Sequence, residues 1–358
     1  MKITIAVPVY NREATLKSCL DSLINQTMNS EEYEIICVDD CSNDKSLEIL
    51  NEYKEKYNNL RIIVRENNSG GASEPRNDAI KEANGEYIFF VDSDDYIGEE
   101  SLERMYKFAS GNNTDVLVIK TRGVNGRGAA KSMFKNGNIE QAEIIENRLC
   151  YTLGPVKMFK RSFLEKNDIF FPTDIKVKED QIFMMQAYTL ASVISILADY
   201  DYYYAVKHDG NHLGPIIMPL DIELKRIARV IDVIEEGIQN INYRNKVKAE
   251  YFNRILTSDW TSFFYERKGW SYEQKKSWMN LFSDYLNNSI DRKVDEYILN
   301  QYKYKIKCFR ENDLDKLIKL SSFEKNISMN DIVRVENGLI LARYAEENKN
   351  NSFEEEIK

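Results

Sequence analysis

The stretch YIFFVDSDDY at residues 87–96 places the strongest constraint on what this chain can fold into. It begins as a run of large apolar and aromatic residues, which predicts a strand buried on both faces. It ends in three acids, Asp92, Asp94 and Asp95. Because open α/β sheets bind ligands at the carboxyl ends of their strands, these acids predict a ligand site. Taken alone, the stretch favours a polar turn in which Asp94 or Asp95 caps the next helix, and the neighbouring segments decide for the ligand site.

Strand and helix patterns alternate on both sides of this stretch, joined by short loops. Buried-strand patterns cover residues 2–8, 33–39, 60–64 and 115–120, and helical spacing covers residues 14–26, 42–57, 76–83 and 101–109. This alternation predicts an α/β fold, a mostly parallel Rossmann-like sheet with helices on both faces. The polar segments that follow the strands then converge on one edge; they are residues 8–11, 39–40, 67–76 and 92–94.

The composition narrows the class of protein. The chain has 358 residues, 43% of them hydrophobic, enough for one large core or two domains. Its net charge of -9 argues against non-specific binding of nucleic acid. Five cysteines, with only a loose Cys37/Cys41 pair, indicate a reduced, cytoplasmic protein without structural disulfides. Residues 1–9 lack signal-peptide features, and no apolar run is long enough to cross a bilayer. We therefore expect no transmembrane segment, and a protein that is soluble or peripheral at the inner face of the membrane.

Four motifs in order make a family recognisable. They are AVPVYNRE (6–13), CVDDCSNDKS (37–46), NNSGGASEPRNDAIKEANGEY (67–87) and FFVDSDDYI (89–97). Together they resemble the family 2 glycosyltransferases with the GT-A fold, over about the first hundred residues. A dinucleotide-binding site is excluded, because PVYNRE stands where GxGxxG would follow the first strand.

Later segments narrow the resemblance. GVNGRG (123–128), KSMF (131–134), YTLGPVKMFKRSFLEKNDIFFP (151–172) and KEDQIF (178–183) are similar to the wall teichoic acid β-N-acetylglucosaminyltransferases, up to about Leu320. This implies an inverting, metal-dependent enzyme that moves N-acetylglucosamine from UDP-N-acetylglucosamine to hydroxyls of poly(ribitol phosphate), an anionic polyol-phosphate polymer. Two alternatives stay open. The same fold could act on a capsular or other surface polysaccharide, or an inert GT-A domain could serve as a binding or assembly module.

The resemblance implies a nucleotide-sugar site along the sheet edge. Tyr10 can present an aromatic surface to uracil, with a plain core aromatic as the alternative. In the family the second acid of the Asp39–Asp40 pair accepts the uracil N3–H, so we assign Asp40 to the base; Asp39 could cap the helix that begins at Ser42. Arg76 is expected to open a helix, with a planar cation suited to a phosphate or a uracil carbonyl. The expected donor-binding residues are Pro8, Tyr10, Asp40, Asn68, Arg76, Asp92, Ser93, Asp94 and Arg127.

The resemblance also implies a Mn²⁺ or Mg²⁺ cofactor. Asp94 resembles the family's metal-binding acid, with diphosphate oxygens and water completing the shell. Asp92 is expected to contact ribose or sugar hydroxyls. Both histidines, His208 and His212, lie in KHDGNHLG (207–214). We place His212 over the metal or the diphosphate, with a purely structural role as the alternative.

A second acid pair, Glu179–Asp180, precedes a helical pattern at residues 181–191. The family's catalytic base lies in such a pair, and Asp180 aligns with it. A carboxylate there can take the proton of an acceptor hydroxyl as that oxygen attacks the anomeric carbon. The alternative is that both acids only favour the helix N-terminus through its dipole. Arg127 and Lys131 are candidates to receive the anionic acceptor, or are solvated loop charges.

The second half changes to helical patterns at residues 222–238, 246–265, 271–286 and 294–320. The last carries more apolar surface than one terminal helix needs, which indicates an oligomer interface, and the resemblance implies a homotrimer. Two apolar runs around Asn337–Gly338 predict a β-hairpin that packs on the helices or begins a further β-domain outside this chain. The expected divisions are a catalytic domain (1–215), a helical region (216–326), the hairpin (327–344) and a disordered tail (345–358).

Overall fold

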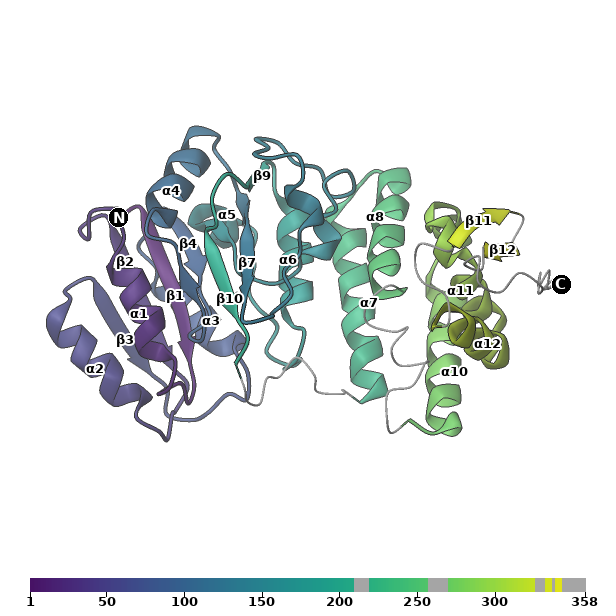
Figure 1. Ribbon diagram of the computed structural model, residues 1–358, viewed down its shortest axis with the longest axis horizontal. Helices are drawn as coiled ribbons and strands as arrows, with labels where there is room; N and C mark the ends of the chain where they lie inside the picture. The colour runs from purple at the N-terminus through teal and green to yellow at the C-terminus, as the bar shows by residue number, and fades with distance from the viewer. Residues whose placement is uncertain (209–218, 257–269, 326–331, 337–338, 343–358) are drawn as a thin grey trace, which may run out of the picture. The chain divides into compact units, whose positions relative to one another are not determined.

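The computed structural model describes residues 1–208, 219–256, 270–325, 332–336 and 339–342 (Figure 1). Contacts divide the chain into two compact units, Met1–Ile238 and Gln239–Lys358. Across the described ranges, no helix combines the length and the apolar character needed to cross a membrane.

A seven-stranded sheet organises the first unit, in the order β3-β2-β1-β4-β8-β6-β9. Its strands are β1 (Ile3–Val9), β2 (Tyr33–Asp39), β3 (Leu60–Val64), β4 (Tyr87–Phe90), β6 (Val116–Ile119), β8 (Met158–Lys160) and β9 (Ile194–Leu197). Only β8 runs antiparallel to its neighbours β4 and β6, so the expected mostly parallel sheet is confirmed. The sequence patterns missed β8, because three residues are too few to show a period.

Helices cover both faces of this sheet (Figure 1). They are α1 (Leu16–Ile24), α2 (Ser46–Lys56), α3 (Ser73–Glu82), α4 (Ser101–Gly111), α5 (Arg161–Lys166) and α6 (Asp180–Leu190). Helix α7 (Leu220–Gly237) packs on α6, and the unit also contains the 3-10 turns η1 (Ser132–Phe134) and η2 (Leu149–Tyr151). Helical spacing in residues 14–26 predicts an apolar stripe of Leu16, Cys19, Leu20, Leu23 and Ile24. The first four are buried in the core, and Ile24 is partly buried against it.

Two of the differences between expected and observed helix starts affect polar residues near the strand ends. Helix α2 begins at Ser46 rather than Ser42, because the Ser42 hydroxyl accepts the Asn11 N–H instead of capping the helix. The Ser42 N–H in turn donates to an Asp39 carboxylate oxygen at 3.1 Å. Helix α3 begins at Ser73, so Arg76 lies inside the helix and does not open it. The first difference leaves Ser42 in the loop after β2, and the second places Arg76 in the first turns of α3.

Aromatic packing fixes the segment that leads into α6. Phe171 and Phe183 stack with ring centroids 3.8 Å apart, and Phe90 of β4 meets both rings edge-on. Asn77 of α3 exchanges two hydrogen bonds with the Phe171 backbone, each 2.8 Å long. The start of α6 is therefore held against the carboxyl end of β4, although the two are far apart in sequence.

A smaller three-stranded sheet joins β5 (Tyr96–Ile97), β10 (Tyr203–Val206) and β7 (Thr121–Val124). Strand β10 pairs antiparallel with β5 and parallel with β7. Strand β5 directly follows Asp95, so residues 92–95 connect the large sheet to this smaller one.

The second unit contains α8 (Ile241–Arg254), α10 (Tyr272–Ser289), η4 (Arg292–Tyr297), α11 (Asn300–Glu311), α12 (Leu314–Lys325), β11 (Ile332–Glu336) and β12 (Leu339–Ala342). The expected single helix at residues 294–320 is wrong. The chain is extended at Ile298 and Leu299, and Asn312 is left-handed with φ 55°, so three helical pieces form. Strands β11 and β12 pair antiparallel around residues 337–338, which lie outside the described residues.

Candidate active site

Tyr10 stands exposed where β1 ends. Its side chain is 43% exposed, so it is not the plain core aromatic that was the alternative. Pro8 lies in β1 opposite Val38 of β2. Asn11, which follows Tyr10, has a left-handed backbone with φ 51°, and its side-chain oxygen accepts a hydrogen bond from the Asn43 N–H at 2.9 Å. These contacts tie the turn after β1 to the turn after β2, and leave the Tyr10 ring available to a planar ligand.

Asp40 fastens the glycine-rich loop to the end of β2. It is only 3% exposed, and its carboxylate accepts hydrogen bonds from the Asn68 side chain (3.0 Å) and the Ser69 hydroxyl (2.8 Å). The Ser69 N–H also donates to it, and Arg65 Nε lies 3.1 Å away. A uracil N3–H would have to share this carboxylate with the loop. Asp40 and Asn68, two expected donor-binding residues, are thus brought together.

Arg76 lies between Asp92, after β4, and Glu179, at the start of α6. Its guanidinium donates to Asp92 Oδ1 at 2.8 Å and to Glu179 Oε1 at 3.1 Å. The residue is 6% exposed, and the guanidinium carbon lies 5.2 Å from the centroid of the Phe171 ring. Burial opposes its charge, but the two carboxylates outweigh burial and raise the pKa of Arg76. The cation is therefore engaged by carboxylates, and a phosphate or uracil contact for Arg76 remains a prediction.

The acids Glu179 and Asp180 stand at the start of α6. Asp180 is the first helical residue and is half-buried, whereas Glu179 is buried against Arg76. Burial raises the pKa of Glu179 to about 7; the charge of Asp180 adds to this and Arg76 opposes it. Glu179 is thus engaged by Arg76, and the assignment of Asp180 as the acid that accepts a substrate's proton stays a prediction.

The three acids after β4 have different partners. Asp92 binds Arg76, whereas Asp95 accepts the Tyr203 hydroxyl and the Val206 N–H, both at 2.7 Å. Burial, with the charge of Asp92, raises the pKa of Asp95 to about 6. Asp94 faces Arg12, with Nε 3.9 Å from its carboxylate. Ser93 between them is buried, and its carbonyl accepts the Thr15 hydroxyl at 3.2 Å. Asp95 therefore holds β10, a role that the sequence did not reveal.

Arg127 and the first histidine also reach this edge. Arg127 donates to the Val206 carbonyl at 2.9 Å and lies 3.5 Å from Asp95 Oδ1. The His208 Nε2 hydrogen-bonds the Asp94 carbonyl at 2.6 Å. His212, the expected metal ligand, lies outside the described residues. The sequence predicted a site role for His212 and none for His208, because the segment at residues 207–214 offered no signal to distinguish the two histidines.

The donor set for a metal is small. Within the part of the chain that the structure describes, no cluster of three or more His, Cys, Asp or Glu side chains could hold an ion. Asp94 offers one carboxylate whose described partner is a distant guanidinium. Mg²⁺ in nucleotide sites is bound by one or two carboxylates together with substrate phosphates. The residues present therefore fit an ion that binds jointly with a diphosphate.

Lys157, which the sequence did not single out, lies just before β8. It is 3% exposed, and its Nζ donates to the Gly154 carbonyl at 2.6 Å. Its own carbonyl accepts the Phe90 N–H, which puts Lys157 beside the last residue of β4. Burial lowers the pKa of Lys157 to about 7, while the negative charge of Asp180 acts in the opposite direction. A buried amine thus lies within electrostatic range of Asp180.

Replacing Lys157 by Met is expected to stabilise the fold at neutral pH. The pKa of Lys157 is depressed in the folded state, from 10.5 to about 7, so the unfolded chain binds the extra proton between these values. The wild-type free energy of unfolding therefore rises with pH across that window. Methionine has no charge to bury, so the variant should gain about 1–3 kcal/mol at pH 7 and less near pH 10.

Urea unfolding of both proteins across pH 6–10 measures this gain. Lys160→Met is the matched control, because the Lys160 side chain is partly exposed and bonds to Asn113. An equal gain in both variants, or a gain that grows with pH, would contradict the prediction.

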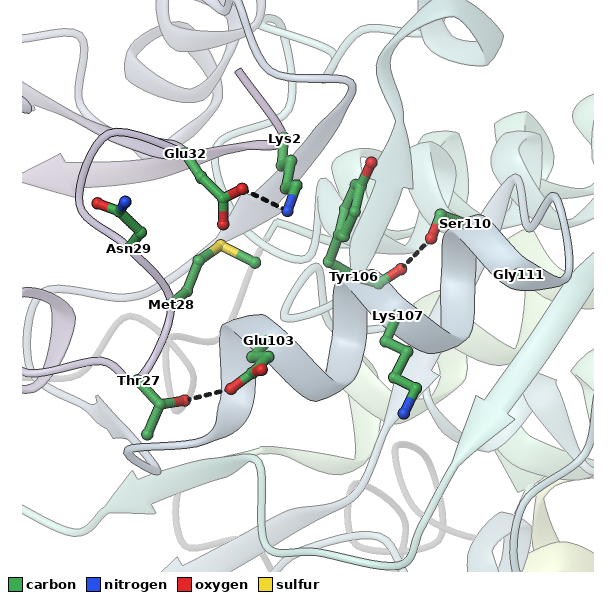
Figure 2. Close-up of a pocket in the computed structure, with 10 residues that line it drawn as sticks. All are labelled: Lys2, Thr27, Met28, Asn29, Glu32, Glu103, Tyr106, Lys107, Ser110 and Gly111. Carbon is green, nitrogen blue, oxygen red and sulfur yellow. Dashed lines mark hydrogen bonds and ion pairs between the residues drawn. The ribbon is translucent and has the colours of Figure 1, made fainter.

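A cavity of about 470 Å³ lies at the other end of the strands (Figure 2). It is lined by Lys2, which precedes β1, and by residues 27–29, 32 and 103–111 in part. Lys2 pairs with Glu32 at 2.5 Å and Thr27 donates to Glu103 at 2.9 Å (Figure 2). None of the expected site residues lines this cavity, so the candidate site is the edge where the strands end.

Two family models match the sequence. The model described as glycosyl transferase family 2 matches residues 4–171, and the glycosyl transferase TarS linker domain matches residues 224–321. The first match contains the acids of the β2 and β4 ends, and the second begins within α7.

Three relatives match most or all of this chain in sequence. A poly(ribitol-phosphate) beta-glucosyltransferase of Bacillus spizizenii is 43% identical over 358 residues, which is 100% of this chain and 56% of its own length. The poly(ribitol-phosphate) beta-N-acetylglucosaminyltransferase TarS of Staphylococcus aureus is 37% identical over 88% of this chain and 54% of its own length. TarP of S. aureus, with the same described activity, is 35% identical over 87% of this chain and 96% of its own length. The chain thus spans about half the length of the first two relatives.

A solved structure agrees along almost the entire chain. The crystal structure of S. aureus TarS 1–349 in complex with UDP-GlcNAc superposes with a TM-score of 0.85 and 34% identity, covering 97% of this chain and 98% of that chain. The chain therefore belongs to glycosyl transferase family 2, with a GT-A fold followed by a TarS linker domain, and is homologous to the poly(ribitol-phosphate) glycosyltransferases TarS and TarP.

Proposed function

We propose that this chain transfers a sugar from a UDP-sugar to a hydroxyl of poly(ribitol phosphate), with inversion at the anomeric carbon. The observation that carries the proposal is the buried Arg76, which binds Asp92 at the expected donor site and Glu179 beside the expected base. One guanidinium thereby sets the spacing between the groups that would hold the donor and the group that would activate the acceptor. The named activities of the three relatives support the same acceptor.

The reaction is a single displacement. Asp180 takes the proton of the acceptor hydroxyl while the hydroxyl oxygen forms a bond to the anomeric carbon. The bond from that carbon to the UDP oxygen breaks, and UDP leaves with the electron pair. An α-linked donor then yields a β-linked product. Tyr10 and Asp40 bind the uridine, with Pro8 and Asn68 shaping the turn and loop that hold them, and Asp92 and Ser93 orient the ribose or the sugar.

A divalent cation, Mn²⁺ or Mg²⁺, belongs to the proposal. Asp94 is the residue that would hold it together with the donor's diphosphate, and His212 is the second expected ligand. When bound, the ion would act as a Lewis acid for the charge on the departing UDP. Arg12 beside Asp94 and Arg127 beside Asp95 add positive charge at the same edge.

We propose N-acetylglucosamine as the transferred sugar. TarS and TarP carry that activity in their names, and the TarS structure with UDP-GlcNAc matches 97% of this chain. Glucose is the second candidate, because the Bacillus spizizenii relative, a glucosyltransferase, is 43% identical over the whole chain. The two sugars differ at one ring substituent, so one pocket contact suffices to separate them.

Release of UDP from each donor tests the proposal. UDP-N-acetylglucosamine and UDP-glucose are each offered with poly(ribitol phosphate), and with poly(glycerol phosphate) as a control polymer of similar charge. Faster release with N-acetylglucosamine and only with the ribitol polymer is the expected result. Faster release of UDP from UDP-glucose would show that glucose, and not N-acetylglucosamine, is the transferred sugar. Release only with other surface polymers overturns the acceptor, and no release with any acceptor favours an inert binding module.

We further propose that the helical region assembles the chain into a homotrimer. In the second unit Ile241, Tyr272, Leu281 and Leu299 expose apolar side chains to solvent. Singly exposed apolar residues are common on monomers. The apolar stripe from which the interface was predicted is buried within the chain at residues 302, 306, 309, 314 and 317, so the trimer rests on the resemblance to the family. Light scattering at micromolar concentration should report three chains per particle, and a monomer under these conditions would rule this assembly out.

A further inference from the structure

The residues on either side of the proposed base's acid pair both reach helix α7. Lys178 Nζ lies 3.5 Å from Glu223 Oε1. Gln181 Oε1 accepts a hydrogen bond from Arg226 Nη1 at 2.5 Å. Glu223 and Arg226 are one turn apart on α7, and α6 packs along α7 within the first unit. The residues that flank Glu179 and Asp180 therefore both form polar contacts with the same helix.

Glu223 and Arg226, the two α7 residues that make these contacts, form a buried ion pair. Arg226 is 0% exposed, and its Nε and Nη2 donate to the two oxygens of Glu223 at 3.2 and 2.6 Å. Glu223 and Gln181 are also buried. Burying an ion pair costs desolvation that its attraction barely offsets, so such a pair contributes little net stability. Its two-point geometry instead fixes where each polar group points.

The opposite side of the acid pair is held by a different element. Arg76 of α3 binds Glu179, while Lys178 sits in the left-handed region with φ 60°. A non-glycine residue in that region is sterically unfavourable and persists only where its surroundings hold it. The turn that leads into α6 therefore has a strained backbone at Lys178 and is held by contacts to α3 on one side and to α7 on the other. Asp180 lies within this turn.

We propose that Glu223 and Arg226 are positioning residues that hold the turn at Lys178–Gln181 and so orient Asp180 toward the acceptor. The TarS linker match begins at residue 224, so the first helix of that match takes part in the geometry of the chemical step. This inference rests on the proposed function for its kinetic consequence. Its structural consequence, the order of the turn, is independent of it.

The test compares Arg226→Met with Arg229→Met. Both changes lie on α7, but Arg229 is partly exposed and bonds Asp174 at 2.6 Å. Arg226→Met should lower kcat by roughly 10–100-fold and leave the KM for the UDP-sugar within about twofold, because a displaced base slows the step without touching the donor site. Arg229→Met should leave both unchanged, and Arg226→Lys should restore part of kcat. If a folded Arg226→Met protein keeps wild-type kcat, the proposal is overturned.

Two further measurements keep the outcome decisive. Gln181→Met removes the same contact without leaving a buried carboxylate unpaired, so it carries the kinetic test if Arg226→Met fails to fold. Hydrogen exchange of the backbone amides at Lys178–Phe183 should accelerate in the variants and stay constant in Arg229→Met. Unaltered exchange there overturns the proposal even if the wild-type chain transfers no sugar; that absence of transfer would instead refute the proposed function.

Discussion

Asp180→Asn should keep its affinity for UDP and lose transfer by about 10³-fold in kcat, within the usual range for removing a general base. The amide has the same size and suits the first turn of α6, so the fold and the donor site stay intact. It cannot accept the proton of the acceptor hydroxyl. Calorimetry with UDP and steady-state UDP release with poly(ribitol phosphate) measure the two effects separately.

Asp168→Asn is the matched control for this change. Asp168 is exposed and left-handed with φ 51°, a conformation that asparagine also adopts readily. It makes the same change of charge and size in the loop before α6, and its kinetics should equal those of the wild type. If Asp180→Asn transferred sugar at the wild-type rate, Asp180 would not be the base.

The second large effect is expected from Asp94→Ala. Its carboxylate has one described charged contact, Arg12 at 3.9 Å, so its loss should not unfold the chain. We expect kcat to fall by about 10²–10⁴-fold, because a Lewis-acidic ion supplies several kcal/mol at a departing phosphate. The strengthening of UDP binding by Mn²⁺, measured by calorimetry, should disappear as well, which gives a readout apart from turnover.

Two comparisons sharpen that result. Asp94→Glu keeps the charge but moves it by one methylene, and should recover part of the Mn²⁺ effect. Asp199→Ala removes an exposed acid after β9, which accepts the Tyr202 hydroxyl, and should change neither quantity. If Asp94→Ala retained Mn²⁺-dependent transfer, the metal assignment to Asp94 would be wrong.

The regular part of the fold was predictable because its signals are local. Apolar runs at residues 33–39 and 87–90 are long enough to show that both faces are buried, and the helical stripe of α1 needs only its own neighbours. Elements without a period were missed. Strand β8 has three residues and β5 has two, and the break at Asn312 interrupts an apolar pattern that continues on both sides.

The identity of the candidate acids was also visible in the sequence, but their partners were not. The pattern at residues 92–95 shows acids at a strand end, yet nothing in it separates Asp94 from Asp95. That separation follows from Tyr203 and Val206, more than a hundred residues away, whose groups engage Asp95. Lys157 and Arg226 gave no signal for the same reason, since a charged residue is ordinary until its burial is known.

The ordered strand-end motifs in the chain therefore predict an α/β sheet with an acidic edge, because strand direction and side-chain period are properties of short segments. Only the tertiary structure determines which polar or charged groups each charged residue contacts. Arg76 binds both Asp92 and Glu179, the second of them 103 residues further along the chain, and Arg226 binds Gln181, 45 residues before it. These contacts exist only after the sheet and helices pack. Coulomb and hydrogen-bond energies depend on distances of a few ångströms, which residue order along the chain does not encode locally.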